Sequence, residues 1–72
     1  MKPTPKTMDG KNLIYEEVFR SPFARATEDE ARKVLEDIRS YHPASSGWVE
    51  IESNIDKTSE GYVAWRKHAK YG

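Results

Sequence analysis

A single capped amphipathic helix limits this chain to a small set of folds. Thr27 is a preferred N-cap residue, and Glu30, three positions later, completes a capping box. Apolar residues then recur at helical spacing until Pro43 ends the segment, and they are Ala31, Val34, Leu35 and Ile38. Because this apolar stripe is narrow, the helix has one face to bury and needs one partner surface.

Segments typical of β-strands lie on both sides of this helix. Residues 13–23 are rich in β-branched and aromatic side chains, but they alternate imperfectly, which indicates a bulge or a change of face. Residues 48–55 alternate strictly, and residues 62–68 alternate again after a polar turn at residues 56–61. The predicted fold is therefore α+β: a small antiparallel sheet of three to four strands with one α-helix packed across a face, in β-α-β-β order.

The length of the chain fits one domain. A chain of 72 residues buries only about 60% of its unfolded surface, so the core should be thin. Residues 1–12 contain Pro3, Pro5 and Gly10 without apolar periodicity, and we expect a flexible N-terminal tail there. Residues 13–72 would then form a single α+β binding domain. The absence of cysteine, of a signal peptide and of a long apolar run predicts a soluble monomer in a reducing cytoplasm.

The charge distribution argues for a protein partner. Lysine and arginine balance aspartate and glutamate over the whole chain. All the acidic residues lie between positions 9 and 60, however, and the basic excess is at the two ends. A neutral chain with an acidic middle is poorly suited to neutralise phosphates, so we do not expect direct binding to nucleic acid.

No constellation in the sequence predicts catalysis, a metal site or a cofactor. The two histidines, His42 and His68, are far apart in the chain, so they cannot form a helical metal-binding pair. We expect His42 to be solvated or to cap carbonyls at the end of the helix, and His68 to lie at the surface. Glu50 and Glu52 should point the same way from one strand and form an acidic patch. The sequence thus predicts a binding protein and no enzyme.

Aromatic and basic residues of the last two strands are the candidate contact residues. Trp48 has the opposite parity to Val49 and Ile51, so it should face away from the helix if those two face it. The alternative for Trp48 and Trp65 is that they complete the core. Tryptophan, tyrosine and arginine often dominate protein interfaces. We therefore expect the partner to contact Trp48, Tyr62, Trp65, Arg66 and Lys67.

The layout of the chain resembles that of a known class of phage proteins. Residues 26–53 read ATEDEARKVLEDIRSYHPASSGWVEIES, and the hairpin that follows ends in GYVAWRKHAKYG. In size and strand–helix–strand–strand plan, this is similar to the small phage-encoded proteins that bind bacterial RNA polymerase, such as the transcription regulator of a lytic Xanthomonas phage and the inhibitor of the T-odd coliphages. The likeness covers residues 13–72, with matches at Thr27, at Asp29, Glu30 and Ala31, and at Arg66 and Lys67.

This resemblance implies a function. Such a protein would dock stoichiometrically near the β′ N-terminal region and the RNA exit channel of the host polymerase, and would inhibit transcription initiation. Antitermination would be a second activity, and the protein would act in the host bacterial cytoplasm. Two alternatives remain open. One is another phage antagonist of host defence, an anti-CRISPR-like protein that mimics phosphate with Glu50 and Glu52. The other is a small nucleic-acid-binding domain that uses the basic C-terminus.

Overall fold

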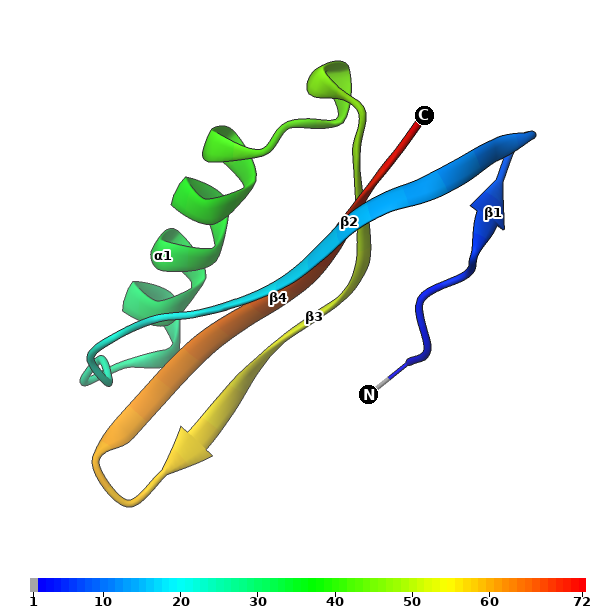
Figure 1. The fold of residues 1–72 in the computed structure, drawn as a ribbon. Helices are drawn as coiled ribbons and strands as arrows, with labels where there is room; N and C mark the ends of the chain where they lie inside the picture. Colours follow the sequence, from blue (N-terminus) through cyan, green and yellow to red (C-terminus); the bar gives the residue numbers. More distant parts are fainter. Residues whose placement is uncertain (1) are drawn as a thin grey trace.

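The fold is a curved antiparallel sheet with a helix on one side. The computed structural model describes residues 2–72, and within them the chain forms two strands, a helix, a short 3-10 helix and two long strands (Figure 1). The bounds in chain order are β1 (Thr7–Met8), β2 (Lys11–Arg20), α1 (Glu28–Tyr41), η1 (Ala44–Ser46), β3 (Trp48–Thr58) and β4 (Gly61–Tyr71). No helix among these residues is long and apolar enough to cross a membrane.

The strand order places the last strand in the middle of the sheet. The four strands are arranged β1-β2-β4-β3, and each neighbouring pair is antiparallel. The predicted α+β class, with a single helix packed on a small antiparallel sheet, is confirmed. The short strand β1 is an addition at the start of the predicted order.

The helix forms as its sequence predicts. The Oγ1 atom of Thr27 accepts a hydrogen bond of 3.2 Å from the backbone N–H of Glu30, which completes the N-cap. Ala31, Leu35 and Ile38 are buried against Ala64 of β4, with Val34, Ile55 and Tyr62 packed around them. Alanine at positions 31 and 64 lets the helix lie close to the sheet, because neither side chain extends beyond Cβ.

The β3–β4 hairpin is longer than expected. The two strands extend to Thr58 and from Gly61, so the turn contains only Ser59 and Glu60 rather than residues 56–61. The backbone of Gly61 has φ +134°, and a Cβ at this position would collide with the carbonyl oxygen of Arg25. The close approach is needed for the bridge between Arg25 and Tyr62, in which two backbone hydrogen bonds of 2.7 and 2.8 Å are exchanged.

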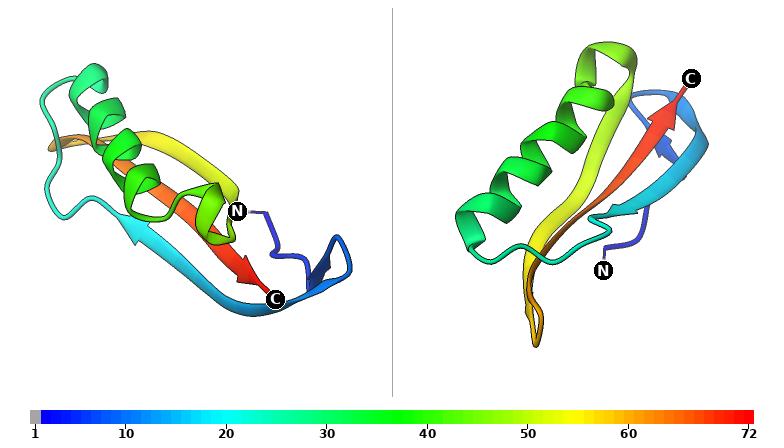
Figure 2. Two further views of the ribbon diagram at one scale, coloured as in Figure 1. Left: turned by 90° about the horizontal axis from the view of Figure 1, so that it is seen from above. Right: turned by 90° about the vertical axis from the view of Figure 1, so that its left-hand side faces the viewer.

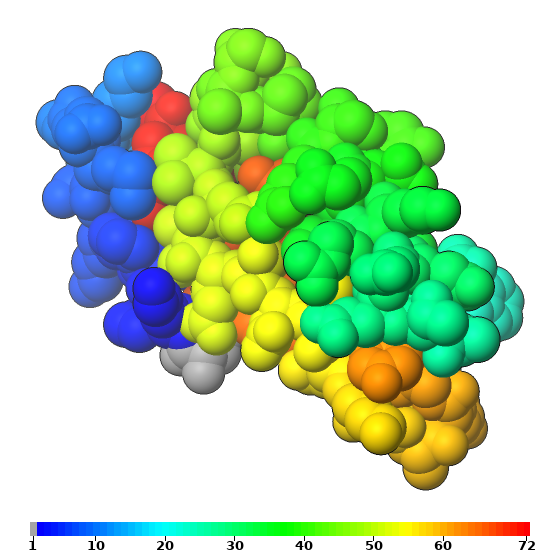
Figure 3. Space-filling view, turned by 180° about the vertical axis from the view of Figure 1, so that it is seen from behind, coloured from blue at the N-terminus to red at the C-terminus, as the bar shows by residue number. Residues whose placement is uncertain are grey.

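The N-terminal segment crosses the face of the sheet opposite the helix (Figures 2 and 3). Tyr71 donates its hydroxyl hydrogen to the carbonyl of Pro5 at 2.7 Å, and Lys67 Nζ donates to the carbonyl of Lys2 at 2.8 Å. Trp65 is only 8% exposed on this face. A flexible tail is expected from the sequence up to residue 12, whereas in the structure β1 pairs with the first residues of β2. Met1 lies outside the described residues.

Two β-bulges change which side chains share a face. Glu50 is opposite His68, but Glu52 is opposite Lys67, because Ile51 is an extra residue in β3. Glu50 therefore lies on the helix side and Glu52 on the opposite side, and the predicted common acidic patch is wrong. Trp48 also lies on the helix side, because Val49, which pairs with Ala69, takes the opposite face and the condition that Val49 faces the helix is not met. A second irregularity occurs in β2 between Leu13 and Tyr15.

Candidate functional site

A groove lies between α1 and β2 because the helix covers only part of the sheet. The helix packs on β4 and β3, and β2 extends beyond its edge (Figure 2). The side chains of β2 that face the helix side are consequently left without a cover, and among them Tyr15 and Phe19 are exposed. The groove has a volume of about 360 Å³ and is lined by Glu17, Phe19, Ile38, Tyr41 and His42.

Exposed aromatic side chains mark the two walls of this groove. Tyr41, in the last turn of α1, is 80% exposed, and Phe19 on β2 is 37% exposed. Ile38, one turn before Tyr41 in α1, also lines the groove and is buried. Large apolar groups in solvent cost free energy in the isolated protein, and contiguous patches of them commonly mark binding surfaces.

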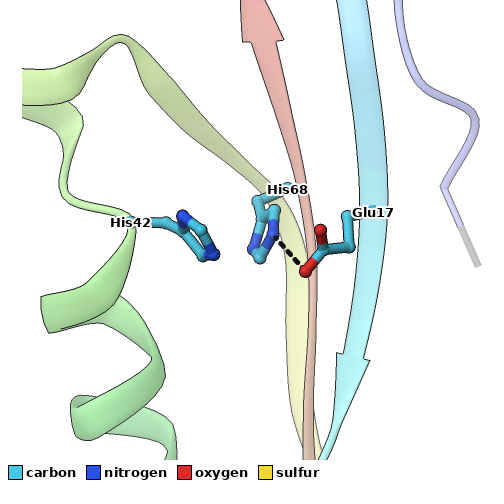
Figure 4. Close-up of side chains that lie close together, drawn as sticks. All are labelled: Glu17, His42 and His68. Carbon is cyan, nitrogen blue, oxygen red and sulfur yellow. Dashed lines mark ion pairs between the residues drawn. The ribbon is translucent and has the colours of Figure 1, made fainter.

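Glu17, His42 and His68 meet at the inner end of the groove (Figure 4). His42 is the C-cap residue of α1, and its backbone N–H donates to the carbonyl of Ile38 at 3.3 Å. Glu17 and His68 are directly opposite each other on β2 and β4. One potential ligand atom from each of the three side chains lies within 4.8 Å of the others. Three separate elements thus contribute to one cluster.

His68 is fully buried, with 0% of its surface exposed. Its Nε2 atom is 3.5 Å from Oε1 of Glu17, and among the described residues neither ring nitrogen has a hydrogen-bond partner. Burial lowers the pKa of His68 below its ordinary value, and the positive charge of Arg66 and the neighbouring His42 act in the same direction. Glu17 opposes this shift. The expectation of a surface position for His68 is wrong, because the central strand places it beneath the end of the helix.

Trp48 closes the cluster on the side of β3. Its ring centroid is 4.5 Å from that of His42 and 4.8 Å from that of His68, and the Trp48–His68 contact is edge-on. Tyr15 packs edge-on against the other side of Trp48 at 5.9 Å. Trp48 is therefore half-buried among other rings and helps to separate the histidines from water.

A charged network lies beside the histidines. Glu50 accepts hydrogen bonds from Arg39 at 2.8 and 3.1 Å, and its Oε1 lies 3.2 Å from Nε of Arg66. Hydrogen bonds from Arg39 and Ser53, and the charges of Arg39 and Arg66, lower the pKa of Glu50, although partial burial opposes the shift. Arg66 also donates to the carbonyl of His42 at 3.1 Å. The network thus fixes the end of the helix against β4.

The structure separates the five predicted contact residues. Trp48 belongs to the histidine cluster, and Tyr62 packs against the helical core. Trp65 and Lys67 lie on the opposite face of the sheet, where Trp65 is buried and Lys67 binds the N-terminal segment. Arg66 is only 3% exposed and is engaged with Glu50. Within residues 2–72, the five side chains form no common surface.

The groove residues that sequence reasoning missed are Phe19, Tyr41 and the Glu17–His68 pair. Tyr41 follows Ile38 by three positions, so the helical spacing continues the apolar stripe to Tyr41 and could have placed it on the sheet side of the helix. The pairing of Glu17 with His68 depends on the register between β2 and β4, for which the sequence carries no local signal.

Comparison of the chain with protein-family models, curated proteins and solved structures finds no match. The geometry of the groove and of its side chains is therefore the basis for a functional proposal.

Proposed function

We propose that this protein is a non-catalytic binding module that docks on a protein partner through the groove between α1 and β2. The observation that carries the proposal is the exposure of Tyr41 and Phe19 on facing walls of one groove. Tyrosine and phenylalanine bring a large contact area at a low cost in conformational entropy, because each has only two side-chain torsions. A side chain of the partner that enters between them would remove both rings from water.

The charge of Glu17, which lines the groove, would orient such a partner. Arg39 lies on the other side of α1, where it pairs with Glu36 and with Glu50 of β3. Charges at the border of an interface mainly affect the association rate and the orientation of the partner. A partner that inserts an apolar side chain flanked by a basic residue would satisfy both Tyr41 and Glu17.

For the identity of the partner, we propose bacterial RNA polymerase, on the basis of the resemblance at residues 13–72 to small phage-encoded polymerase-binding proteins. Inhibition of transcription initiation, with antitermination as a second effect, is the activity that this partner implies. The two rival functions have less support. The anti-CRISPR-like alternative relied on Glu50 and Glu52 sharing a face, and the bulge at Ile51 separates them. The nucleic-acid alternative relied on a basic C-terminus in which Arg66 is buried and paired.

The direct test uses purified bacterial core polymerase and the full-length chain. We expect measurable binding, which Tyr41→Ala should weaken by at least about tenfold, the effect of losing a typical interface hot spot. Phe23→Ala is the matched control, because Phe23 is an aromatic residue with 72% exposure before the opposite end of α1. A modest salt dependence would agree with a protein interface, whereas a steep one would favour nucleic-acid binding.

Two results would contradict the proposal in different ways. If polymerase binds both variants equally, the groove is not the docking surface. If the wild-type protein does not bind purified polymerase at micromolar concentrations, the proposed partner is wrong.

A further inference from the structure

We propose that Glu17, His42 and His68 form a binding site for a divalent transition-metal ion, with Zn²⁺ as the best fit. Two imidazoles and one carboxylate converge from β4, the end of α1 and β2 (Figure 4). This donor set is typical of zinc sites that have three protein ligands and an open fourth position. The proposal does not depend on the identity of the protein partner.

The distances are close to those that a metal ion requires. With metal–ligand bonds of about 2.0–2.1 Å, tetrahedral ligand atoms are separated by about 3.3–3.4 Å. The Glu17 Oε1 and His68 Nε2 atoms are already 3.5 Å apart. All three potential ligand atoms lie within 4.8 Å of one another. His42 is half-buried at the end of the helix, and its side chain would rotate to bring a ring nitrogen to the metal.

The buried imidazole of His68 is the second, independent indication. Its Nδ1 and Nε2 atoms are both buried, and among residues 2–72 neither has a hydrogen-bond partner. An unsatisfied buried polar atom destabilises the folded state, so native proteins rarely retain one without a use. Nε2 faces Glu17, and a metal ion between them would satisfy this nitrogen and the carboxylate together.

The chemistry of the ligands selects the metal. Imidazole nitrogen suits zinc, copper, nickel and iron, whereas calcium and magnesium prefer oxygen ligands. The carboxylate of Glu17 neutralises part of the charge of a divalent ion. Arg66 lies nearby and would repel a cation, but its ion pair with Glu50 weakens this repulsion. The site should therefore bind Zn²⁺ in clear preference to Mg²⁺.

A metal at this position would join the end of α1 to the middle of the sheet. Small domains with thin cores often gain stability from such a link. An ion that binds the folded state and not the unfolded state raises the melting temperature in proportion to the logarithm of its concentration. The fourth position of the metal would face the groove between Phe19 and Tyr41 and would hold water or a ligand atom of a partner.

The test is a zinc titration of the full chain without a polyhistidine tag, followed by calorimetry and by thermal unfolding. We expect one equivalent of Zn²⁺ to bind and to raise the melting temperature, while Mg²⁺ at the same concentration does not. Glu17→Gln and His42→Gln should each weaken zinc binding by at least about 10–100-fold. This is the loss that follows when a residue hydrogen-bonded to a metal ligand is mutated, and the loss of a ligand itself should be no smaller. Both side chains are partly exposed, so these variants should fold.

Glu16→Gln is the matched control, because Glu16 neighbours Glu17 in β2, is exposed and lies on the other face of the sheet. It should leave zinc binding unchanged. With Co²⁺ in place of zinc, the wild-type protein should show the intense visible absorption of a four-coordinate site, and Glu17→Gln should lose it. Absence of a zinc-induced shift in the wild-type protein, or an equal shift in Glu17→Gln and Glu16→Gln, would overturn the proposal.

Discussion

Glu50 holds two arginines at the junction of the helix and the sheet. It accepts hydrogen bonds from Arg39 and lies against the buried guanidinium of Arg66, whose own donor reaches the carbonyl of His42. An arginine that is 3% exposed and loses its anion would be left with an uncompensated charge. The position of this single carboxylate therefore controls how the helix end is anchored.

The lowered pKa of Glu50 gives a pH-dependent prediction for Glu50→Gln. Because the folded pKa lies below the unfolded value, the unfolded chain binds more protons between the two values, and stability falls as pH falls. The contribution of Glu50 is fully present above the unfolded pKa and is lost as the pH drops through the folded pKa. We expect Glu50→Gln to cost about 1–3 kcal/mol at pH 7, since charged hydrogen bonds are removed. Urea unfolding from pH 7 to pH 3 should show this difference narrowing.

Glu36→Gln provides the control for that series. Glu36 also contacts Arg39, at 2.6 Å, but its side chain is mostly exposed, so its removal should cost no more than about 0.5 kcal/mol. A difference between the wild-type protein and Glu50→Gln that stays constant with pH would contradict the assignment of the shift to this network.

At the scale of elements, the helix was predictable and the faces of the strands were not. The N-cap, the apolar stripe and the terminating proline are local signals, and all of them are confirmed for α1. The strand regions were also recognisable, but a bulge depends on the partner strand. The extra residue Ile51 reverses the alternation of β3, so that Trp48 and Glu50 turn toward the helix and Glu52 turns away.

Thr27→Ala tests the helix start. Loss of the Oγ1 atom leaves the backbone N–H of Glu30 without its capping acceptor, and we expect a loss of about 1 kcal/mol in the free energy of unfolding. Thr27→Ser keeps the acceptor and should unfold at nearly the wild-type urea concentration. If alanine and serine lower the free energy of unfolding equally, the methyl group of Thr27, and not its Oγ1 hydrogen bond, stabilises the protein.

At the scale of the whole molecule, the site results from topology. Positions 17, 42 and 68 are distant in the chain, and they meet because β4 lies between β2 and β3 while α1 ends above it. The groove likewise depends on where the helix crosses the sheet, since a helix centred over β2 would cover Phe19. Neither the meeting of these three positions nor the place where the helix crosses the sheet can be read from composition or periodicity. For this reason the predicted contact residues lie on both faces of the sheet.

The opposite face of the sheet gives the prediction for Tyr71→Phe. The hydroxyl of Tyr71 donates to the carbonyl of Pro5, 66 positions away in the chain, and so ties the N-terminal segment to the central strand. Removing this hydrogen bond should cost about 0.5–1.5 kcal/mol. Since the lost contact holds only this segment, trypsin should cleave after the exposed Lys6 about 2- to 12-fold faster, while the hairpin stays protected.

Tyr41→Phe is the control, because Tyr41 is exposed in the groove on the helix side. Equal cleavage rates in the two variants would mean that the Tyr71 hydroxyl does not hold the segment in place.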